Sequence, residues 1–171
     1  VRLVKGAYWD QETIEADAHG FDAPQFLNKV ESDLHFQQLC IRILEHPDEV
    51  QLCLGSHNLR DHCFARAARE TLYPDSPPIE HQVLHMTSEG LAIAMAEQGW
   101  AVRNYIPVGS LLVGMAYLVR RIMENSSQVG ILTMARQGVD LRKALLSPGE
   151  ALRSMRHDGT IGRDAGCEGD A

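Results

Sequence analysis

The sequence lacks any hydrophobic run that approaches the roughly 20 residues of a membrane-spanning helix, and its N-terminus has no signal-peptide pattern. These absences argue against a secreted or integral membrane protein. We therefore predict a cytoplasmic protein, with peripheral contact at the inner membrane left open.

Paired cysteine motifs are also missing. Cys40, Cys53, Cys63 and Cys167 show no Cys-x-x-Cys spacing, and the first three lie in apolar stretches. This usage is typical of reduced, buried thiols in a cytosolic protein, so no disulfide framework is expected.

An excess of basic residues is absent as well. The chain carries 16 basic and 23 acidic residues, which gives a net charge of -7. Binding to a nucleic-acid backbone depends on neutralising phosphates, so nucleic acid is not an expected partner. With 44% apolar and 23% charged residues in 171, the chain has an ordinary globular composition.

Short β-prone runs alternate with amphipathic segments along most of the chain. The expected strands are 1–5, 49–54, 79–85 and 101–106, and the expected helices are 10–18, 32–45, 59–71, 89–98 and 111–125. This alternation predicts an α/β fold with a parallel sheet and right-handed crossovers. Periodicity alone does not distinguish an open sheet from a closed (β/α)8 TIM-type barrel.

The two ends of the chain differ from this pattern. From about residue 137 the sequence becomes rich in Gly, Arg and Asp, and residues 162–171 have almost no apolar content. We predict a linker or tail over 137–171 that is disordered at its end. Because the chain begins with Val1 inside an apparent strand, we expect it to be a fragment.

The ends of the expected strands carry aromatic and hydrogen-bonding groups. In parallel α/β folds such groups gather at the carboxyl edge of the sheet. The segments concerned are Lys-Gly-Ala-Tyr-Trp at 5–9, Ser-His-Asn at 56–58, Gln-Val-Leu-His at 82–85 and Tyr-Ile-Pro-Val-Gly at 105–109. Together they predict the lining of a large ligand site.

The expected helix 111–125 places Tyr117, Arg120, Arg121 and Glu124 on one face. Two adjacent guanidinium groups match a carboxylate bidentately, which indicates an organic acid as ligand. The alternative is a solvated face with an Arg120–Glu124 pair. Since the rest of the helix is apolar nearly all round, we expect it to be buried and its charges to have partners.

These segments, in this order and spacing, together with Arg-Leu-Val-Lys-Gly-Ala-Tyr-Trp-Asp at 2–10 and Tyr-Leu-Val-Arg-Arg-Ile-Met-Glu-Asn at 117–125, resemble the motifs of proline dehydrogenase. The resemblance is closest to bacterial bifunctional proline utilisation A and covers about residues 1–136. It implies a distorted (β/α)8 barrel that holds FAD, of which this chain supplies strands five to eight.

The resemblance also implies roles for individual residues. Arg120, Arg121, Tyr105, Tyr117 and Tyr8 would contact the substrate, L-proline, through its carboxylate and ring. The cofactor would be contacted by Arg2, Val4, Lys5, Gly6, Trp9, Lys29, His57, Asn58, Gln82, Leu84 and Glu124. The implied reaction is hydride transfer from proline to flavin N5, giving pyrroline-5-carboxylate, with a quinone as electron acceptor. A fused aldehyde dehydrogenase domain is a further implied partner.

The chain departs from the family pattern at two places. Asn28 stands where the family usually has arginine, although Lys29 is kept, and Val129-Gly130 replaces a Thr-Ser pair. The family also uses a lysine and an aspartate from its early strands, which this chain does not contain. We therefore predict that the isolated chain is inactive.

Other functions remain open at this point. The chain could be a non-catalytic fragment or interaction module, or part of a barrel enzyme of another reaction class. His81 and His85 lie on one face of an expected strand, but their spacing does not ensure convergence, so no metal site is predicted.

Overall fold

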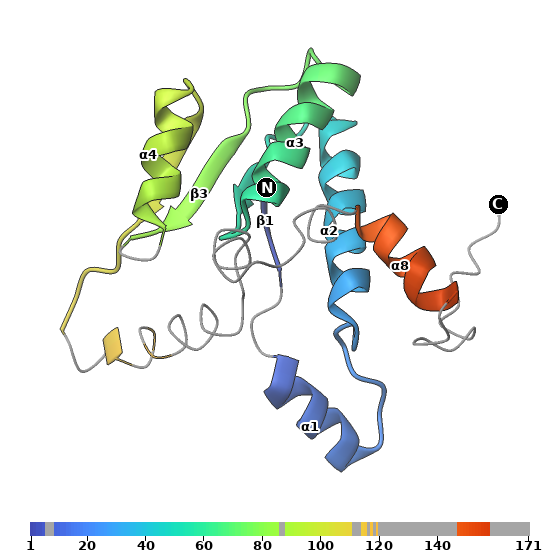
Figure 1. Ribbon diagram of the computed structural model, residues 1–171. Coiled ribbons are helices and arrows are strands. Elements are labelled where there is room, and N and C mark those ends of the chain that lie inside the picture. The colour runs from blue at the N-terminus through green and yellow to red at the C-terminus, as the bar shows by residue number, and fades with distance from the viewer. Residues whose placement is uncertain are drawn as a thin grey trace, which may run out of the picture.

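The computed structural model describes residues 1–5, 9–85, 88–110, 114, 115, 117, 119 and 147–157. Its centre is a sheet of four strands, β1 (Arg2–Val4), β2 (Cys53–Gly55), β3 (Glu80–Leu84) and β4 (Ala101–Tyr105). The strands pair in the order β1-β2-β3-β4 and every pair is parallel (Figure 1). The predicted parallel α/β fold is confirmed.

The connections between the strands are helical. The helices are α1 (Trp9–His19), α2 (Lys29–Leu44), α3 (Leu59–Leu72), α4 (Glu89–Glu97) and α8 (Pro148–His157). All four helices expected before residue 100 are present. Residues 114, 115, 117 and 119 are also helical, in agreement with the helix expected over 111–125.

Two element boundaries differ from the prediction for local reasons. Helix α2 begins at Lys29 rather than 32, because the side chain of Asn28 caps it by accepting a hydrogen bond from the amide of Val30 at 2.9 Å. Strand β2 begins at Cys53 rather than 49. The preceding residues form a turn in which the amides of Glu49 and Val50 donate to the carbonyl of His46.

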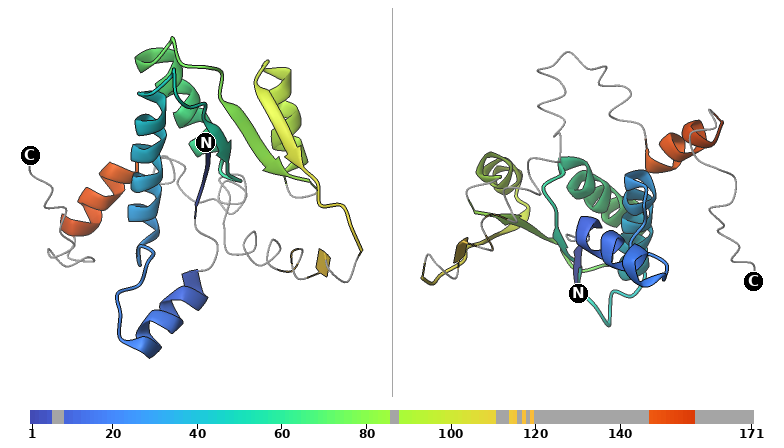
Figure 2. Two further views of the ribbon diagram at one scale, coloured as in Figure 1. Left: turned by 180° about the vertical axis from the view of Figure 1, so that it is seen from behind. Right: turned by 90° about the horizontal axis from the view of Figure 1, so that it is seen from below.

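The core lies between the sheet and the helices α2 and α3, which lie together on one side of β1 and β2 (Figure 2). Its buried members are Leu3, Phe36, Cys40, Leu44, Leu52, Leu54, Ala65, Ala68 and Ile79. A second cluster, formed by Val83, Ala92 and Met95, packs α4 against β3. The sheet is therefore covered by helices on the face that carries Leu3, Leu54 and Val83.

Two predictions of burial are wrong. Cys63 is exposed, because it lies on the outer side of α3, whereas Cys40 is buried. In the helical segment after β4, the side chains of Met115 and Val119 are 43% and 48% exposed. Because nearly half of each of these residues is exposed, the expectation of a fully buried helix is wrong at these two positions.

Helix α8 lies within the expected tail and packs along α2 (Figure 2). It begins with a capping box: the Ser147 amide donates to the Glu150 carboxylate, and the Glu150 amide donates to the Ser147 hydroxyl. Met155 then lies 4.0 Å from the side-chain amide of Asn28. The division of the chain near residue 136 stays a prediction, as does disorder over 162–171, which lies outside the described residues.

In the part of the chain that the structure describes, no helix is both long and apolar enough to cross a bilayer.

Candidate functional site

The face of the sheet opposite the helices, called the inner face below, carries the predicted ligand residues of the strands, which are Arg2, Val4, Gln82, Leu84 and Tyr105. Along β1, Leu3 is buried against the helices, whereas Arg2 and Val4 are exposed on the other face. The strand register aligns Val4 with Gly55, Gln82 and Arg103 in one row, and Leu84 with Tyr105 in the next. Because aligned residues of parallel strands point to the same side, these side chains share a face.

Arg2, Tyr105 and Tyr117 form one cluster on this face. The guanidinium carbon of Arg2 lies 6.0 Å from the ring centroid of Tyr105, within the range of a cation–π contact. The rings of Tyr105 and Tyr117 are 5.8 Å apart and tilted by 47°, a common geometry for aromatic pairs. The structure thus brings together residues 2, 105 and 117, which are far apart in the sequence.

Gly55 leaves room for this arrangement. A Cβ atom at this position would lie 2.9 Å from Cγ1 of Val4 and 3.7 Å from Nε of Arg2. The guanidinium of Arg2 therefore passes directly over the glycine backbone of β2. The side chains of Val4 and Arg2 thus pack against this backbone, and a glycine leaves the room that they need.

The ammonium group of Lys5 lies on the helix side of the sheet. It is 2.6 Å from Asp33 of α2 and 2.8 Å from Asp61 of α3, and it lies over the ring of Phe36 at 5.0 Å. Burial raises the pKa of Asp33, but hydrogen bonds and charges from Lys5 and Lys29 more than offset this and leave that pKa below its ordinary value. Contact between Lys5 and a ligand on the inner face would therefore come from its backbone.

The loop after β2 is held by its own hydrogen bonds. The hydroxyl of Ser56 donates to Asp61 at 2.7 Å and accepts from the amide of Asn58 at 3.1 Å. The side-chain oxygen of Asn58 then caps α3 through the amide of Arg60. This geometry fixes the backbone at the carboxyl end of β2.

His57 in the same loop reaches the next unit of the fold. Its Nδ1 is 2.9 Å from the hydroxyl of Ser88, at the start of α4. The two predicted ligand residues of this loop, His57 and Asn58, are thus placed between the carboxyl ends of β2 and β3.

Gln82 belongs to a charged cluster that the sequence did not indicate. Its amide donates to Glu80 at 2.6 Å, and Arg103 donates two hydrogen bonds to the same carboxylate at 2.7 and 2.6 Å. Hydrogen bonds from Arg103 and Gln82 lower the pKa of Glu80 to about 2. Opposite charges at diagonal positions on the same face of β3 and β4 were the available signal for this pair, since Arg103 is aligned with Gln82, two residues after Glu80.

Lys29 is the exposed positive charge at the start of α2. Its side chain is 63% exposed and is 2.9 Å from Asp33. Its neighbour Asn28 serves as the helix cap. At the position where the resemblance leads us to expect an arginine, the side chain thus makes a backbone hydrogen bond.

The remaining predicted site residues lie outside the described part of the structure. They are Gly6, Tyr8, Arg120, Arg121 and Glu124, together with the side chain of Trp9.

A second buried contact was not anticipated from the sequence. Nδ1 of His62 on α3 lies 2.9 Å from Nδ1 of His81 on β3, and Nε2 of His62 lies 2.9 Å from the carbonyl oxygen of Ser56. His85, expected on the same strand face as His81, instead pairs with Glu89 at 3.0 Å. Within the described ranges, no group of three or more His, Cys, Asp or Glu side chains is placed to hold a metal ion.

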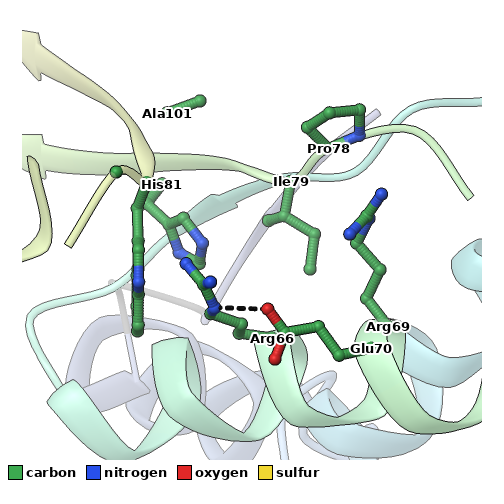
Figure 3. Close-up of a pocket in the computed structure, with 9 residues that line it drawn as sticks. Arg66, Arg69, Glu70, Pro78, Ile79, His81 and Ala101 are labelled. Carbon is green, nitrogen blue, oxygen red and sulfur yellow. Dashed lines mark ion pairs between the residues drawn. The ribbon is translucent and has the colours of Figure 1, made fainter. Parts of the chain in front are cut away.

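A cavity of about 150 Å³ lies at the opposite end of the strands (Figure 3). It opens between α3 and the starts of β3 and β4. Arg66, which lies over Trp100 at 4.7 Å, pairs there with Glu70 at 2.7 Å. Arg69 donates to the carbonyls of Ser76 and Pro77. None of the predicted ligand residues lines this cavity, so we place the candidate site on the inner face and at the carboxyl ends of the strands.

Comparison with known proteins gives consistent matches. The family model for proline dehydrogenase matches residues 1–134. Bifunctional protein PutA of Salmonella typhimurium is 30% identical over an alignment of 166 residues, which covers 91% of this chain and 12% of that protein. Hydroxyproline dehydrogenase of Bos taurus is 31% identical, over 92% of this chain and 35% of that protein.

Solved structures agree with these matches. Proline utilization A from Bdellovibrio bacteriovorus, inactivated by N-propargylglycine, has a TM-score of 0.79 and 36% identity, over 88% of this chain and 16% of that one. Proline utilization A from Bradyrhizobium japonicum (mutant D779W) has a TM-score of 0.78 and 32% identity, over 90% of this chain and 16% of that one. The chain thus spans a small part of the relatives it matches.

Proposed function

Because the chain belongs to the proline dehydrogenase family, we propose that it supplies the second half of an FAD-dependent, proline-oxidising (β/α)8 barrel, strands five to eight. The observation that carries the proposal is the cluster of Arg2, Tyr105 and Tyr117 on the inner face of the sheet. These residues were expected at a flavin and proline site, and they meet in space although more than 100 positions separate the first from the others.

The described residues fit a flavin. Arg2 supplies a positive charge on the inner face, where its guanidinium is held against the ring of Tyr105 and the backbone of Gly55. Lys29 offers an exposed ammonium for phosphate, and the loop of His57 and Asn58 offers polar contacts at the carboxyl end of β2. We propose that these groups, with Val4, Lys5, Gly6, Trp9, Gln82, Leu84 and Glu124, hold FAD.

The same face would select the substrate. Tyr105 and Tyr117, joined by Tyr8, would wall the pyrrolidine ring of L-proline, while Arg120 and Arg121 would bind its carboxylate. When bound, FAD would accept a hydride at its N5 atom from a ring carbon of L-proline, which yields pyrroline-5-carboxylate, and would pass the electrons to a quinone. The task of the chain's own residues is to orient the ring and to exclude water.

The proposal includes the partners of the bifunctional relatives. We propose a cytoplasmic protein with peripheral contact at the inner membrane, where a quinone is accessible, and an aldehyde dehydrogenase domain in the same polypeptide. The isolated 171-residue chain is proposed to be inactive, since the family's early-strand lysine and aspartate are not among its residues.

A chimera tests this function. The matching segment of Salmonella PutA is replaced by this chain, and L-proline-dependent dye reduction is measured with bound FAD. We expect turnover by the chimera and none by the isolated chain with added FAD. Robust turnover by the isolated chain would show that the half barrel suffices. A folded, FAD-containing chimera that oxidises trans-4-hydroxy-L-proline but not L-proline would show that the proposed substrate is wrong.

A further inference from the structure

The buried pair of His62 and His81 has no part in the proposed reaction. The two side chains are 0% and 2% exposed, and their rings lie 5.1 Å apart at an angle of 53°. His62 belongs to α3 and His81 to the helix-facing side of β3. The contact therefore joins a helix to the strand beside it.

The hydrogen bonds restrict which ring nitrogens carry a proton. A carbonyl oxygen can only accept, so Nε2 of His62 carries the proton that is donated to Ser56. When His62 is neutral, its Nδ1 is an acceptor, and Nδ1 of His81 donates to it across 2.9 Å. A further proton on the pair would then bind to Nε2 of His81 or would break the contact between the two Nδ1 atoms.

The surroundings oppose an added proton. Burial, together with the charges of His62 and Arg66, lowers the pKa of His81 to about 4. Burial also lowers the pKa of His62, although the Ser56 carbonyl and Asp61 raise it in part. These causes act on rings that are held out of water by α3 and β3.

Charged groups face the pair from several elements. Arg66 and Asp61 belong to α3, and His57 belongs to the loop after β2. Asp61 is itself neutralised by Lys5, which follows β1, at 2.8 Å. On the side of β4, the contact of His81 is the uncharged ring of Trp100, at 4.7 Å between centroids. Glu70 of α3 lines the same cavity as His81 but is paired with Arg66 at 2.7 Å, and the charge of Arg66 opposes a proton on His81.

The pair is connected to the proposed cofactor loop through one residue. Ser56 receives the His62 hydrogen bond on its carbonyl and holds Asn58 and Asp61 through its hydroxyl. We propose that His62 and His81 act together as a neutral clamp that positions the loop of Ser56, His57 and Asn58, and that acid opens this clamp. An effect of the clamp on FAD binding rests on the proposed function, whereas the effect of the clamp on the loop does not.

The sign of the pH dependence follows from linkage. Imidazoles exposed by opening titrate near pH 6.5, while the closed pair has lowered pKa values. The clamp's contribution is therefore complete above pH 6.5 and is lost as the pH falls from there toward about 4. Relative to pH 7.5, one such histidine shifts the equilibrium between the closed and the open loop roughly tenfold toward the open loop at pH 5.5, and two shift it up to about a hundredfold.

Hydrogen exchange of the 171-residue chain tests the clamp. Amide protection of residues 53–60 is compared at pH 7.5 and 5.5 after correction for the chemical exchange rate. We expect protection to fall at least about tenfold at the lower pH. His46→Gln, a change at an exposed histidine, should show the same fall. Protection that does not change with pH would overturn the proposal.

Two variants separate a clamp from a merely structural role. His62→Gln keeps an amide donor for the Ser56 carbonyl but has no ionisable ring, and His62→Leu with His81→Phe removes both rings. We expect His62→Gln to keep much of the protection at pH 7.5 and to show a smaller pH dependence, due to His81 alone, and we expect the double variant to lose most of the pH dependence. A pH dependence in His62→Gln equal to that of the parent would contradict the clamp.

FAD binding distinguishes the clamp from the proposed function. In the PutA chimera, the Kd for FAD should rise over the same pH range as the loss of protection, and His62→Gln should flatten this rise. If protection falls while the Kd stays constant, the clamp stands and the role of this loop in binding FAD is wrong.

Discussion

The ammonium of Lys5 shows how a residue can belong to a motif and yet serve the fold. It contacts Asp33 and Asp61 from two different helices, and the side chain of Asp61 is only 4% exposed. Removing one member of such a group leaves a buried charge without compensation. The strand, both helices and the loop of Ser56 depend on this one cation.

Replacing Lys5 by Met should therefore destabilise the chain. We expect the free energy of unfolding to fall by about 3 kcal/mol, because the carboxylates of Asp33 and Asp61 lose their shared partner. Urea unfolding followed by circular dichroism measures the change. The control is Arg42→Met, whose pair with Glu45 is exposed and should contribute less than about 1 kcal/mol. Equal losses in the two variants would contradict this account of Lys5.

Tyr105 links the proposed cofactor and substrate groups. In the PutA chimera, Tyr105→Leu removes the contacts with Arg2 and Tyr117, each worth about 1 kcal/mol. We expect the kcat/KM for L-proline to fall roughly tenfold. Steady-state dye reduction measures it, and Tyr73→Leu, at a position on the helix side, is the control. A kcat/KM unchanged by Tyr105→Leu would remove this ring from the substrate site.

At the scale of elements, α2 shows what local sequence predicts and what it leaves out. Its apolar periodicity predicts a helix, but its first turn depends on the cap by Asn28 and on the packing of α8, which comes from the other end of the chain. The same holds for β2, whose alternation of polar and apolar residues begins four positions before the strand does. There the His46 turn overrides the pattern.

Asn28→Ala tests the cap. The amide of Val30 would lose its acceptor, and we expect a loss of about 1 kcal/mol in the free energy of unfolding. Asn28→Asp, which keeps a side-chain oxygen, should be nearly neutral in comparison. The pair is measured by urea unfolding, and a loss in Asn28→Asp as large as in Asn28→Ala would show that capping is not the cause.

At the scale of the whole molecule, the described sheet has two edge strands, β1 and β4, and a polar inner face that no described helix covers. Unpaired strand edges promote association with other chains. We predict that the chain self-associates, and that Val4→Lys, which adds a charge at an exposed edge position, shifts it toward the monomer. Sedimentation velocity measures this, and a parent chain as monomeric as the Val4→Lys variant would contradict the prediction.

The parts of the site differed in how far the sequence could predict them. The presence of Arg2 and Tyr105 on one face follows from the strand register, but their contact does not, because Arg2 begins β1 and Tyr105 ends β4 at the other edge of the sheet. The side on which Lys5 places its ammonium depends on the pleat and on acidic residues from two helices, which no local pattern reports. The contact of His62 with His81 depends on helix-to-strand packing, and a lone buried histidine gives no signal of its partner.

The central claim is that this chain carries the flavin- and proline-facing residues of a proline dehydrogenase. Anaerobic titration of the FAD-containing PutA chimera with L-proline, followed by flavin absorbance, tests it most directly. We predict that L-proline bleaches the flavin and that D-proline does not. A chimera that binds FAD but keeps its full absorbance at saturating L-proline would contradict the claim.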